Sequence, residues 1–385
     1  MSQAINSRVF EYFGINATNS QWSDWHWQYA HRVTDAATLS QLITLSDQEK
    51  QDIQRCLGNF RMAITPYFAS LMSADDPHCP IRRQVIPSIA ETVVSPVERP
   101  DPLDEDGHSP VPGIVHRYPD RVLFLVTRQC AMYCRYCIRK RHVGEEDFRI
   151  SEDEKAAALD YIARTPQVRD VLISGGDPLT LADADLEDIL ARLRAIPHVE
   201  IIRIGTRVPT ALPMRVTPEL AAMLRRYQPL WINTHFNHPQ ELTAAASLAC
   251  ARLADAGIPL GNQSVLLRGV NDNVETMQEL LLKLVQMRVR PYYLYQCDLC
   301  EGVSHFRTRV EAGLEIIRAL TGNISGFAVP RFVIDTPQGG GKVPVNPQFV
   351  LSITDQQVEM LNYQGKLFHY PQPDLPWPTD GVIEK

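Results

Sequence analysis

The sequence predicts an α/β protein, a partial TIM-like (βα)6 barrel with a helical N-terminal region and a C-terminal extension. From residue 121 onward, short β-branched and apolar runs alternate with longer helical patterns, as is typical of a parallel sheet with helices packed outside it. Six β/α units can be counted, which is too few for a closed barrel of eight strands. We therefore expect an open barrel with reactive groups at the carboxyl ends of its strands.

Three segments are expected along the 385 residues, namely a helical region, the partial barrel and a C-terminal segment, over residues 1–110, 111–300 and 301–385. The first segment is rich in tryptophan and shows helical patterns over 38–57 and 60–73. Its end is a Pro- and Asp-rich stretch from Pro96 to Pro112, which indicates a linker or an irregular loop.

The elements of the barrel follow from hydrophobic periodicity and turn residues. The expected strands are Arg121–Thr127, Val168–Ser174, Glu200–Thr206, Leu230–Phe236, Pro259–Leu267, Arg290–Gln296 and Arg331–Asp335. The expected helices cover 152–164, 182–195, 217–227, 239–256, 274–287 and 309–321. Cys130 follows the first strand closely, where the barrel architecture places chemistry.

Composition excludes several classes of protein. Hydrophobic residues at 44% and charged residues at 22% are ordinary globular values. A net charge of −7 argues against a nucleic-acid surface as the main role. No apolar stretch is long enough to span a bilayer, and the N-terminus has no features of a signal peptide. Eight cysteines in such a chain indicate free thiols and metal ligation, so we expect a cytoplasmic protein with no membrane contact.

Cys130, Cys134 and Cys137 form the most informative motif, a C-x3-C-x2-C run of three thiolates within eight residues. An iron–sulfur cubane normally takes four cysteines, one for each iron. Three ligands leave one iron open, and an open coordination position marks a reactive metal centre. Buried thiols or a zinc site are the alternative interpretation, although a structural zinc ion would need a fourth ligand.

Two glycine-rich runs are further candidates. Gly175, Gly176 and Asp177 follow the second expected strand, where glycines let the backbone approach an amino-acid-like ligand closely, although Gly-Gly-Asp is also an ordinary turn. Nearer the C-terminus stands Asp335-Thr-Pro-Gln-Gly-Gly-Gly-Lys342. Its glycines could cradle a phosphate and its lysine could form a Schiff base with pyridoxal phosphate. A flexible turn with a solvated lysine is the alternative.

The cysteine loop and the Gly-Gly-Asp loop resemble those of the radical S-adenosylmethionine superfamily, in which the second loop more commonly has Glu in place of Asp177. Together with the Gly-Gly-Gly-Lys run they resemble the lysine 2,3-aminomutase family. The resemblance runs from the Trp-rich region to about residue 350. It includes the blocks His116-Arg-Tyr-Pro-Asp-Arg121, Ile204-Gly-Thr-Arg-Val-Pro209, Asn233-Thr-His-Phe-Asn-His-Pro239, Gly261-Asn-Gln-Ser-Val-Leu-Leu267 and Tyr295-Gln-Cys-Asp298.

This resemblance implies three cofactors, a [4Fe-4S] cluster, S-adenosyl-L-methionine and pyridoxal 5′-phosphate. In the family's terms, Cys130, Cys134 and Cys137 are the cluster ligands, and Lys342 is the lysine that carries pyridoxal phosphate. The other implied cofactor contacts are Arg117, Tyr118, Arg121, Gly175, Gly176, Asp177, His235 and Gln263. Among these, the first three match positions near the phosphate and ring of pyridoxal phosphate.

Substrate contacts are also implied by the resemblance. Arg139 matches the arginine that holds the substrate carboxylate, a task that suits a planar guanidinium. Asp298 and Asp335 match two carboxylates that hold a cationic side chain in lysine-specific members, whereas glutamate-using relatives carry a lysine and an asparagine there. Two neighbouring carboxylates repel unless a cation lies between them, so this pocket favours an ammonium or guanidinium group.

One departure concerns zinc. Larger members of the family end in a cysteine cluster that binds zinc together with a cysteine of a neighbouring subunit. Here the tail from Leu367 to Trp377 has no cysteine, and Asn273 stands at the position that matches the neighbour's ligand. We therefore expect no structural zinc. Cys297 and Cys300 form a C-x2-C pair with only two thiolates, and we interpret them as packing residues.

The activity implied is that of an isomerase, an intramolecular aminotransferase that moves the α-amino group of a basic L-amino acid to Cβ, with L-lysine and β-lysine as substrate and product. The implied partners are this amino acid, an electron donor such as flavodoxin or ferredoxin, and further copies in a homo-oligomer, with no nucleic acid. Arginine or ornithine as substrate, and supply of β-lysine for modifying a translation factor, are alternatives. A non-catalytic iron–sulfur protein would have no use for Lys342, Asp298 and Asp335.

Overall fold

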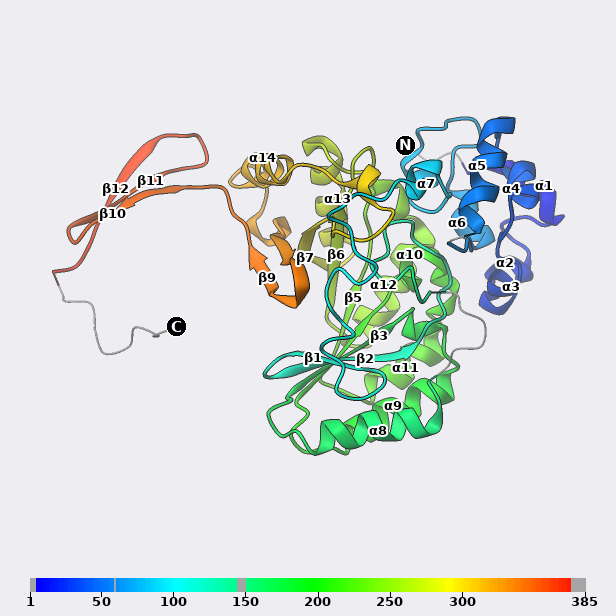
Figure 1. Ribbon diagram of the computed structural model, residues 1–385, viewed down its shortest axis with the longest axis horizontal. Helices are drawn as coiled ribbons and strands as arrows, with labels where there is room; N and C mark the ends of the chain where they lie inside the picture. The colour runs from blue at the N-terminus through cyan, green and yellow to red at the C-terminus, as the bar shows by residue number, and fades with distance from the viewer. Residues whose placement is uncertain (1–4, 59, 144–149, 375–385) are drawn as a thin grey trace.

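The computed structural model describes residues 5–58, 60–143 and 150–374. Its centre is a curved nine-stranded sheet with helices outside it (Figure 1). The N-terminal helices, drawn in blue, pack at one end of this barrel, and a separate three-stranded sheet projects away from it. No helix within these ranges is both long enough and apolar enough to cross a membrane.

The strands of the large sheet lie side by side in chain order: β1 (Ile114–Tyr118), β2 (Arg121–Thr127), β3 (Asp170–Gly175), β4 (Ile201–Gly205), β5 (Leu230–Thr234), β6 (Leu260–Leu266), β7 (Val289–Gln296), β8 (Arg331–Thr336) and β9 (Gly341–Pro344). Strands β2 to β8 pair in parallel, whereas β1 and β9 pair antiparallel at the edges. Because β1 and β9 are opposite ends of this order, the barrel is open. The prediction of a partial barrel built from six β/α units and a final strand is confirmed.

The helices that cover the barrel are α8 (Glu152–Ala163), α9 (Asp183–Arg194), α10 (Val208–Ala211), α11 (Pro218–Arg225), α12 (Ala244–Asp255), α13 (Val274–Gln286) and α14 (Val310–Leu320). Helix α8 begins where the sequence provides a capping box, with the Ser151 hydroxyl and the Glu154 carboxylate each accepting from the other's backbone N–H. Helix α12 begins later than expected from residue 239, because 239–241 form a 3-10 turn and Thr243 caps the helix.

Side chains of the barrel strands point alternately to the two faces of the sheet. One face belongs to the hydrophobic core, and the other faces the interior of the barrel. In β2, Val122, Phe124 and Val126 are buried in the hydrophobic core. Leu123 and Leu125, which point to the other side, are only half-buried. Since one face of each strand packs on helices, the opposite face and the strand ends are free to build a site.

The N-terminal region contains α1 (Ser7–Phe13), α2 (Ser20–Ser23), α3 (Trp25–Ala30), α4 (Ala36–Leu42), α5 (Asp47–Leu57), α6 (Pro66–Ser70) and α7 (Pro80–Arg83). The pattern over 38–57 is two helices rather than one, because Ser46 forms a capping box with Glu49 and starts α5 anew. The pattern over 60–73 is helical only in α6, which starts with Pro66 after its N-cap Thr65. Side chains of these helices join the same buried hydrophobic cluster as those of the barrel.

Five strands had no counterpart in the sequence-based assignment, namely the edge strands β1 and β9 and the three strands β10 (Val350–Ile353), β11 (Gln357–Leu361) and β12 (Leu367–Pro371). The last three form an antiparallel sheet, which we call the C-terminal arm. All five are short and, unlike the equally short β4 and β5, they lie outside the repeated alternation of strand and helix. The 3-10 turns are η1 (Ile89–Thr92), η2 (Pro178–Thr180), η3 (Pro213–Arg215), η4 (Pro239–Glu241), η5 (Ser304–Phe306), η6 (Gly326–Ala328) and η7 (Pro337–Gly339).

Candidate active site

The three cysteines of the C-x3-C-x2-C run lie in the loop after β2, at the carboxyl end of the parallel strands. Burial raises the pKa of Cys130 well above its usual range, and Asp177 and the other two thiols raise it further. Burial, followed by the charge of Cys134, raises the pKa of Cys137 to about 11. The thiols are thus close enough to interact, and the bound iron would have to compensate their charge as thiolates. In the described ranges, no three His, Cys, Asp or Glu side chains converge on a position for a single metal ion.

Two donors point at these sulfur atoms. Nη1 of Arg207 lies 2.7 Å from Sγ of Cys134, and the backbone N–H of Arg139 lies 3.4 Å from Sγ of Cys137. Hydrogen bonds to ligand sulfurs are a common feature of iron–sulfur sites. The cysteine loop therefore fits a cluster held by three thiolates.

The Gly-Gly-Asp loop packs directly against the cysteine loop. A Cβ atom on Gly176 would lie 2.2 Å from the carbonyl oxygen of Gln129, and one on Gly175, whose φ is +125°, would lie 2.2 Å from that of Thr127. The backbone N–H groups of Gly176 and Asp177 donate to these same carbonyls. The two glycines therefore let the backbone of this loop approach the cysteine loop closely, while the expected contact with an amino-acid-like ligand stays a prediction.

Asp177 is buried and its carboxylate is fully used within the protein. It accepts hydrogen bonds from Oγ1 of Thr206 at 2.7 Å and from the backbone N–H groups of Arg207 at 2.7 Å and Leu179 at 3.1 Å. These bonds join the loops after β3 and β4.

Arg139, two residues after Cys137, has a carboxylate partner from a distant segment. Its Nε and Nη2 donate to the two oxygens of Glu105 at 2.8 and 2.6 Å, and both side chains are largely buried. Arg141 pairs with Asp101 and Asp106 of the same segment. The stretch from 96 to 112, expected to be a linker or an irregular loop, is an irregular loop whose acidic residues lie over the end of the cysteine loop.

Lys342 and Asp335 face each other on two neighbouring strands. The register of β8 and β9 places these residues directly opposite, and Nζ of Lys342 lies 2.9 Å from Oδ1 of Asp335. Asp298 follows β7; its burial, and then the negative charge of Asp335, raise its pKa to about 7, while Lys342 opposes this increase. The three residues thus form one electrostatic group. Lys342 lies on strand β9 and not in the flexible turn of the alternative interpretation.

Residues of β1 and β2 complete the surroundings of Lys342. The hydroxyl of Tyr118 accepts a hydrogen bond of 3.0 Å from the backbone N–H of Lys342, and the guanidinium of Arg121 stacks on the Tyr118 ring at 3.8 Å. Arg117 donates to the carbonyl of Leu103, while its buried Nε has no partner among the described residues. A lysine beside a tyrosine and two arginines, one with an unused donor, fits a phosphate-bearing aldehyde such as pyridoxal phosphate.

His235 and Gln263 lie on the same side of the barrel. Nε2 of His235 is 2.9 Å from the hydroxyl of Tyr136, and burial together with the charge of Arg207 lowers the pKa of this histidine to about 3. Nε2 of Gln263 donates to the Tyr295 hydroxyl at 3.1 Å. His235 is therefore neutral at physiological pH, and its ring contributes a hydrogen-bonding group without charge.

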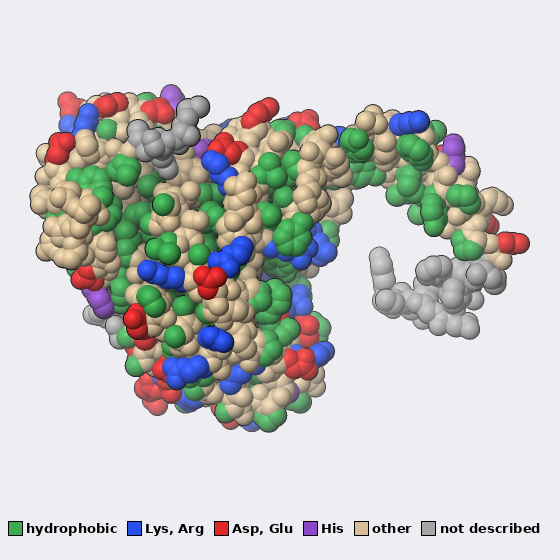
Figure 2. Space-filling view, turned by 180° about the vertical axis from the view of Figure 1, so that it is seen from behind, with side chains coloured by type: hydrophobic (Ala, Val, Ile, Leu, Met, Phe, Trp, Pro, Cys, Tyr) green, Lys and Arg blue, Asp and Glu red, His purple; other side chains and the backbone are tan. Residues whose placement is uncertain are grey.

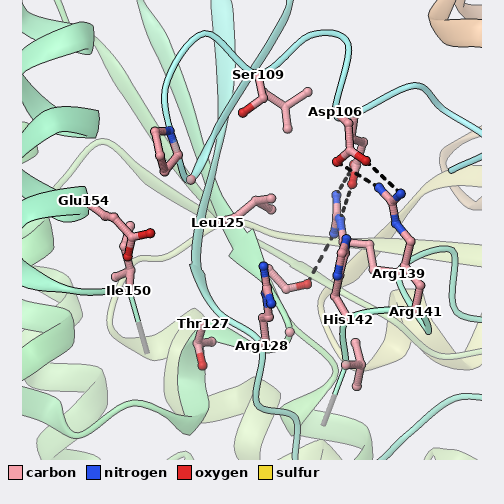
Figure 3. Close-up of a pocket in the computed structure, with 17 residues that line it drawn as sticks. Asp106, Ser109, Leu125, Thr127, Arg128, Arg139, Arg141, His142, Ile150 and Glu154 are labelled. Carbon is pink, nitrogen blue, oxygen red and sulfur yellow. Dashed lines mark hydrogen bonds and ion pairs between the residues drawn. The ribbon is translucent and has the colours of Figure 1, made fainter. Parts of the chain in front are cut away.

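A cavity of about 230 Å³ opens beside the cysteine loop. Figure 3 shows Arg139 and Arg141 pointing from this loop toward the acidic segment that carries Asp106, with Leu125 and Thr127 of β2 nearby. Gly175 and Gly176 complete the lining on the side of β3. The cavity therefore combines a polar, charged wall with backbone from the first two parallel strands.

Other cysteines and Asn273 have structural roles. Cys297 and Cys300 are buried free thiols in a small hydrophobic cluster with Tyr136. The side chain of Asn273 caps α13 by accepting from the N–H of Thr276 at 2.8 Å. Part of the cysteine-free tail, residues 375–377, lies outside the described residues.

Two functional candidates were missed by the sequence reasoning, Glu105 and Arg207. Glu105 lies in a stretch that was interpreted only as a loop, and the signal was its acidic composition opposite the basic run Arg139–Arg141. Arg207 lies two residues after the end of β4, at a carboxyl end where the barrel architecture places chemistry.

Comparisons with known proteins agree with this geometry. Residues 124–281 match the profile of the Radical SAM superfamily, and residues 317–381 match that of the family described as Lysine-2,3-aminomutase. The chain is 54% identical over 370 residues to the L-lysine 2,3-aminomutase of Fusobacterium nucleatum, covering 96% of this chain and 87% of the relative. It is 52% identical over 367 residues to that of Clostridium subterminale, covering 95% and 88%. The glutamate 2,3-aminomutase of Clostridioides difficile is 43% identical over 366 residues, covering 95% and 86%.

Proposed function

Since this chain belongs to the lysine 2,3-aminomutase family of the radical SAM superfamily, we propose that it is a pyridoxal phosphate-dependent 2,3-aminomutase for a basic L-amino acid, with L-lysine as the preferred substrate. The observation that carries this proposal is the electrostatic group of Asp298, Asp335 and Lys342. Two ionised carboxylates next to each other favour a cation, because a positive charge between them relieves their mutual repulsion.

Within the proposed enzyme, each residue has a separate task. The reduced cluster with S-adenosylmethionine would supply the radical, and pyridoxal phosphate would make nitrogen migration accessible. Cys130, Cys134 and Cys137 would hold the cluster, and Lys342 would hold pyridoxal phosphate with Arg117, Tyr118 and Arg121. Arg139 would bind the substrate carboxylate, and Asp298 and Asp335 its side-chain ammonium. Fixing both ends of the substrate orients its Cβ toward the radical source and keeps water out.

Other basic amino acids are the second candidates. Arginine and ornithine also end in cations, so the two carboxylates alone do not distinguish them from lysine. Glutamate is disfavoured, because its side-chain carboxylate would be placed against Asp298 and Asp335. Supply of β-lysine for modifying a translation factor would use the same site and the same reaction.

Two experiments test the proposal. The anaerobically reconstituted enzyme is incubated with L-lysine, L-arginine, L-ornithine and L-glutamate, and β-isomers are detected by chromatography. We expect β-lysine as the main product; turnover of glutamate without lysine would contradict the proposal.

In the second experiment, Lys342→Ala is expected to abolish turnover and the visible absorption band of bound pyridoxal phosphate. Lys283→Ala, which replaces an exposed lysine on α13, should retain both. Retention of the band by Lys342→Ala would show that another residue holds the cofactor.

We also propose that the enzyme is a homo-oligomer that uses its C-terminal arm. Cross-strand pairing puts Val350, Ile353, Val358, Met360, Phe368 and Tyr370 on one face of the arm. This face is apolar, with Ile353 70% and Tyr370 61% exposed, and Figure 2 shows hydrophobic side chains gathered on the projecting arm. A three-stranded sheet needs cover for such a face, and a second copy offers an identical one to pair with it.

The remaining partners follow from the proposed chemistry. A [4Fe-4S] cluster must be reduced before each activation, so we propose flavodoxin or ferredoxin as the electron donor. We further propose a cytoplasmic location, where thiols stay reduced, and an enzyme without structural zinc. Metal analysis of the purified protein should then give iron and no stoichiometric zinc.

A further inference from the structure

Arg207 connects the cysteine loop to a buried polar network that has no assigned role. Its guanidinium donates from Nη1 to Sγ of Cys134 at 2.7 Å. On its other side, Nη2 donates to Oε1 of Glu241 at 2.9 Å and to Oε1 of Gln84 at 2.7 Å. One cationic side chain thus joins a cysteine sulfur to a carboxylate.

The surroundings of Arg207 hold it rigidly. The side chain is 9% exposed and that of Glu241 is fully buried. Oε2 of Glu241 in turn accepts from the backbone N–H groups of Asn237 at 2.5 Å and His238 at 3.1 Å. The backbone N–H of Arg207 donates to Asp177. With both ends anchored, the guanidinium has little freedom to move away from the sulfur.

A fixed positive charge at this place has a defined effect on an iron–sulfur cluster. Reduction adds one electron, and a nearby cation with a hydrogen bond to a ligand sulfur stabilises the reduced state more than the oxidised state. The ring centroids of Phe68 and Tyr136 lie 5.7 and 5.5 Å from Cζ of Arg207, and this burial strengthens the electrostatic interaction. Nε of Arg207 is buried and has no partner in the described parts of the chain, so one more donor is left for the bound group.

We propose that Arg207, oriented by Glu241, makes the reduction potential of the cluster less negative and so makes the cluster easier to reduce. The proposal rests on the cluster of the proposed function but not on the amino acid that is isomerised. It is therefore tested by a potential measurement that needs no substrate, and its failure would leave the aminomutase proposal intact.

The test compares the wild-type enzyme with Arg207→Met and Arg207→Lys. After anaerobic reconstitution to equal iron content, the midpoint potential of the cluster is measured without S-adenosylmethionine, by a redox titration followed by electron paramagnetic resonance. For Arg207→Met we expect the equilibrium constant for reduction of the cluster to fall about tenfold. For one electron, this corresponds to a midpoint potential about 59 mV more negative than that of wild type. Arg207→Lys, which keeps the charge but loses the fork geometry, should fall between Arg207→Met and wild type.

Arg215 provides a matched control, because it is another buried arginine, 1% exposed, that binds the carbonyls of Leu179 and Leu181 and has no bond to a cysteine. Arg215→Met should lower thermal stability and leave the cluster potential unchanged. An unchanged potential in Arg207→Met, with weaker binding of S-adenosylmethionine by equilibrium dialysis, would overturn the proposal and assign the arginine to that ligand instead.

A second variant keeps the proposal testable if Arg207→Met does not retain iron. Arg207→Lys then carries the test, because it keeps the positive charge but loses the fork that reaches both Cys134 and Glu241, so its potential should be more negative than that of wild type. A potential in Arg207→Lys equal to or less negative than that of wild type would contradict the proposal.

Discussion

The guanidinium of Arg139 and the carboxylate of Glu105 form a two-bond ion pair across 34 residues of chain, with distances of 2.8 and 2.6 Å. The pair uses Nε and Nη2 of the arginine, while Nη1 makes a longer contact of 3.4 Å to the carbonyl of Gly175. Glu105 therefore fixes the orientation of the guanidinium and leaves one of its edges for a second carboxylate. This is the arrangement needed if Arg139 binds an amino-acid substrate.

A first prediction concerns Glu105→Gln. Loss of a charge-assisted bidentate bond should raise the KM for the amino acid about tenfold, while iron content and the pyridoxal phosphate band stay unchanged. Steady-state kinetics under anaerobic conditions measure this. Asp106→Asn, whose exposed carboxylate pairs with Arg141, is the control and should keep the KM of wild type. A KM lower than that of wild type would show instead that Glu105 competes with the substrate.

The pH dependence of substrate binding is a second prediction. The pKa of Asp298 is raised to about 7 by burial and then by Asp335, so this carboxyl is mostly protonated at pH 6 and mostly ionised at pH 8. Only the ionised form attracts a cationic side chain, and KM should therefore fall as pH rises through 7 and then level off. Asp298→Asn should raise KM and remove this inflection. An unchanged profile in the variant would assign the inflection to another group.

Asp298 also affects stability, with a definite sign. Its folded-state pKa of about 7 is higher than that of an unfolded aspartate, about 3.9. The folded state therefore binds the proton on Asp298 more tightly than the unfolded state does, and this proton binding raises the free energy of unfolding. The stabilisation is complete below about pH 4 and is lost as pH rises through about 7. Between pH 5 and pH 8, the thermal stability of Asp298→Asn should therefore fall less than that of wild type, as measured by thermal unfolding at both pH values.

A third prediction tests the contact between the first two loops of the barrel. Gly176→Ala would place a methyl group 2.2 Å from the carbonyl oxygen of Gln129, so the cysteine loop would have to move. We expect iron incorporation to fall by more than half, measured per protein after reconstitution. Gly326→Ala, where an added Cβ meets no atom within 4 Å, should incorporate iron like wild type. Normal iron content in Gly176→Ala would mean that the loop can shift without losing its ligands.

The C-terminal arm gives a fourth prediction. Phe368→Glu puts a charge on the apolar face and should dissociate the oligomer, because burying an unpaired carboxylate is costly. Leu367→Glu is the matched control, since this neighbour is 47% exposed, close to the 45% of Phe368, but points to the opposite face. Light scattering after size-exclusion chromatography measures both masses. Dissociation by Leu367→Glu alone would place the interface on the other face.

Much of the barrel could be predicted from local sequence patterns. The seven expected parallel strands all exist, and β2 coincides with the expected Arg121–Thr127, because alternation and helical periodicity repeat over several residues. The edge strands β1 and β9 were missed, since they are short and, unlike the equally short β4 and β5, do not lie between helices in the repeated β/α alternation. The cysteine spacing and the glycine–lysine run were visible because their residues are neighbours in the chain.

Local patterns in the chain are enough to place the alternating elements, the three-cysteine motif and the candidate lysine. The groups that meet across the barrel are known from the fold alone: Lys342 with Asp335 through the register of two strands, Glu105 with Arg139 through the fold of a loop, and Arg207 with Cys134 across 73 residues. The physical reason is that periodicity and spacing report contacts between chain neighbours. Pairing of charges across the barrel depends instead on strand order, register and burial, which form only when the whole chain closes.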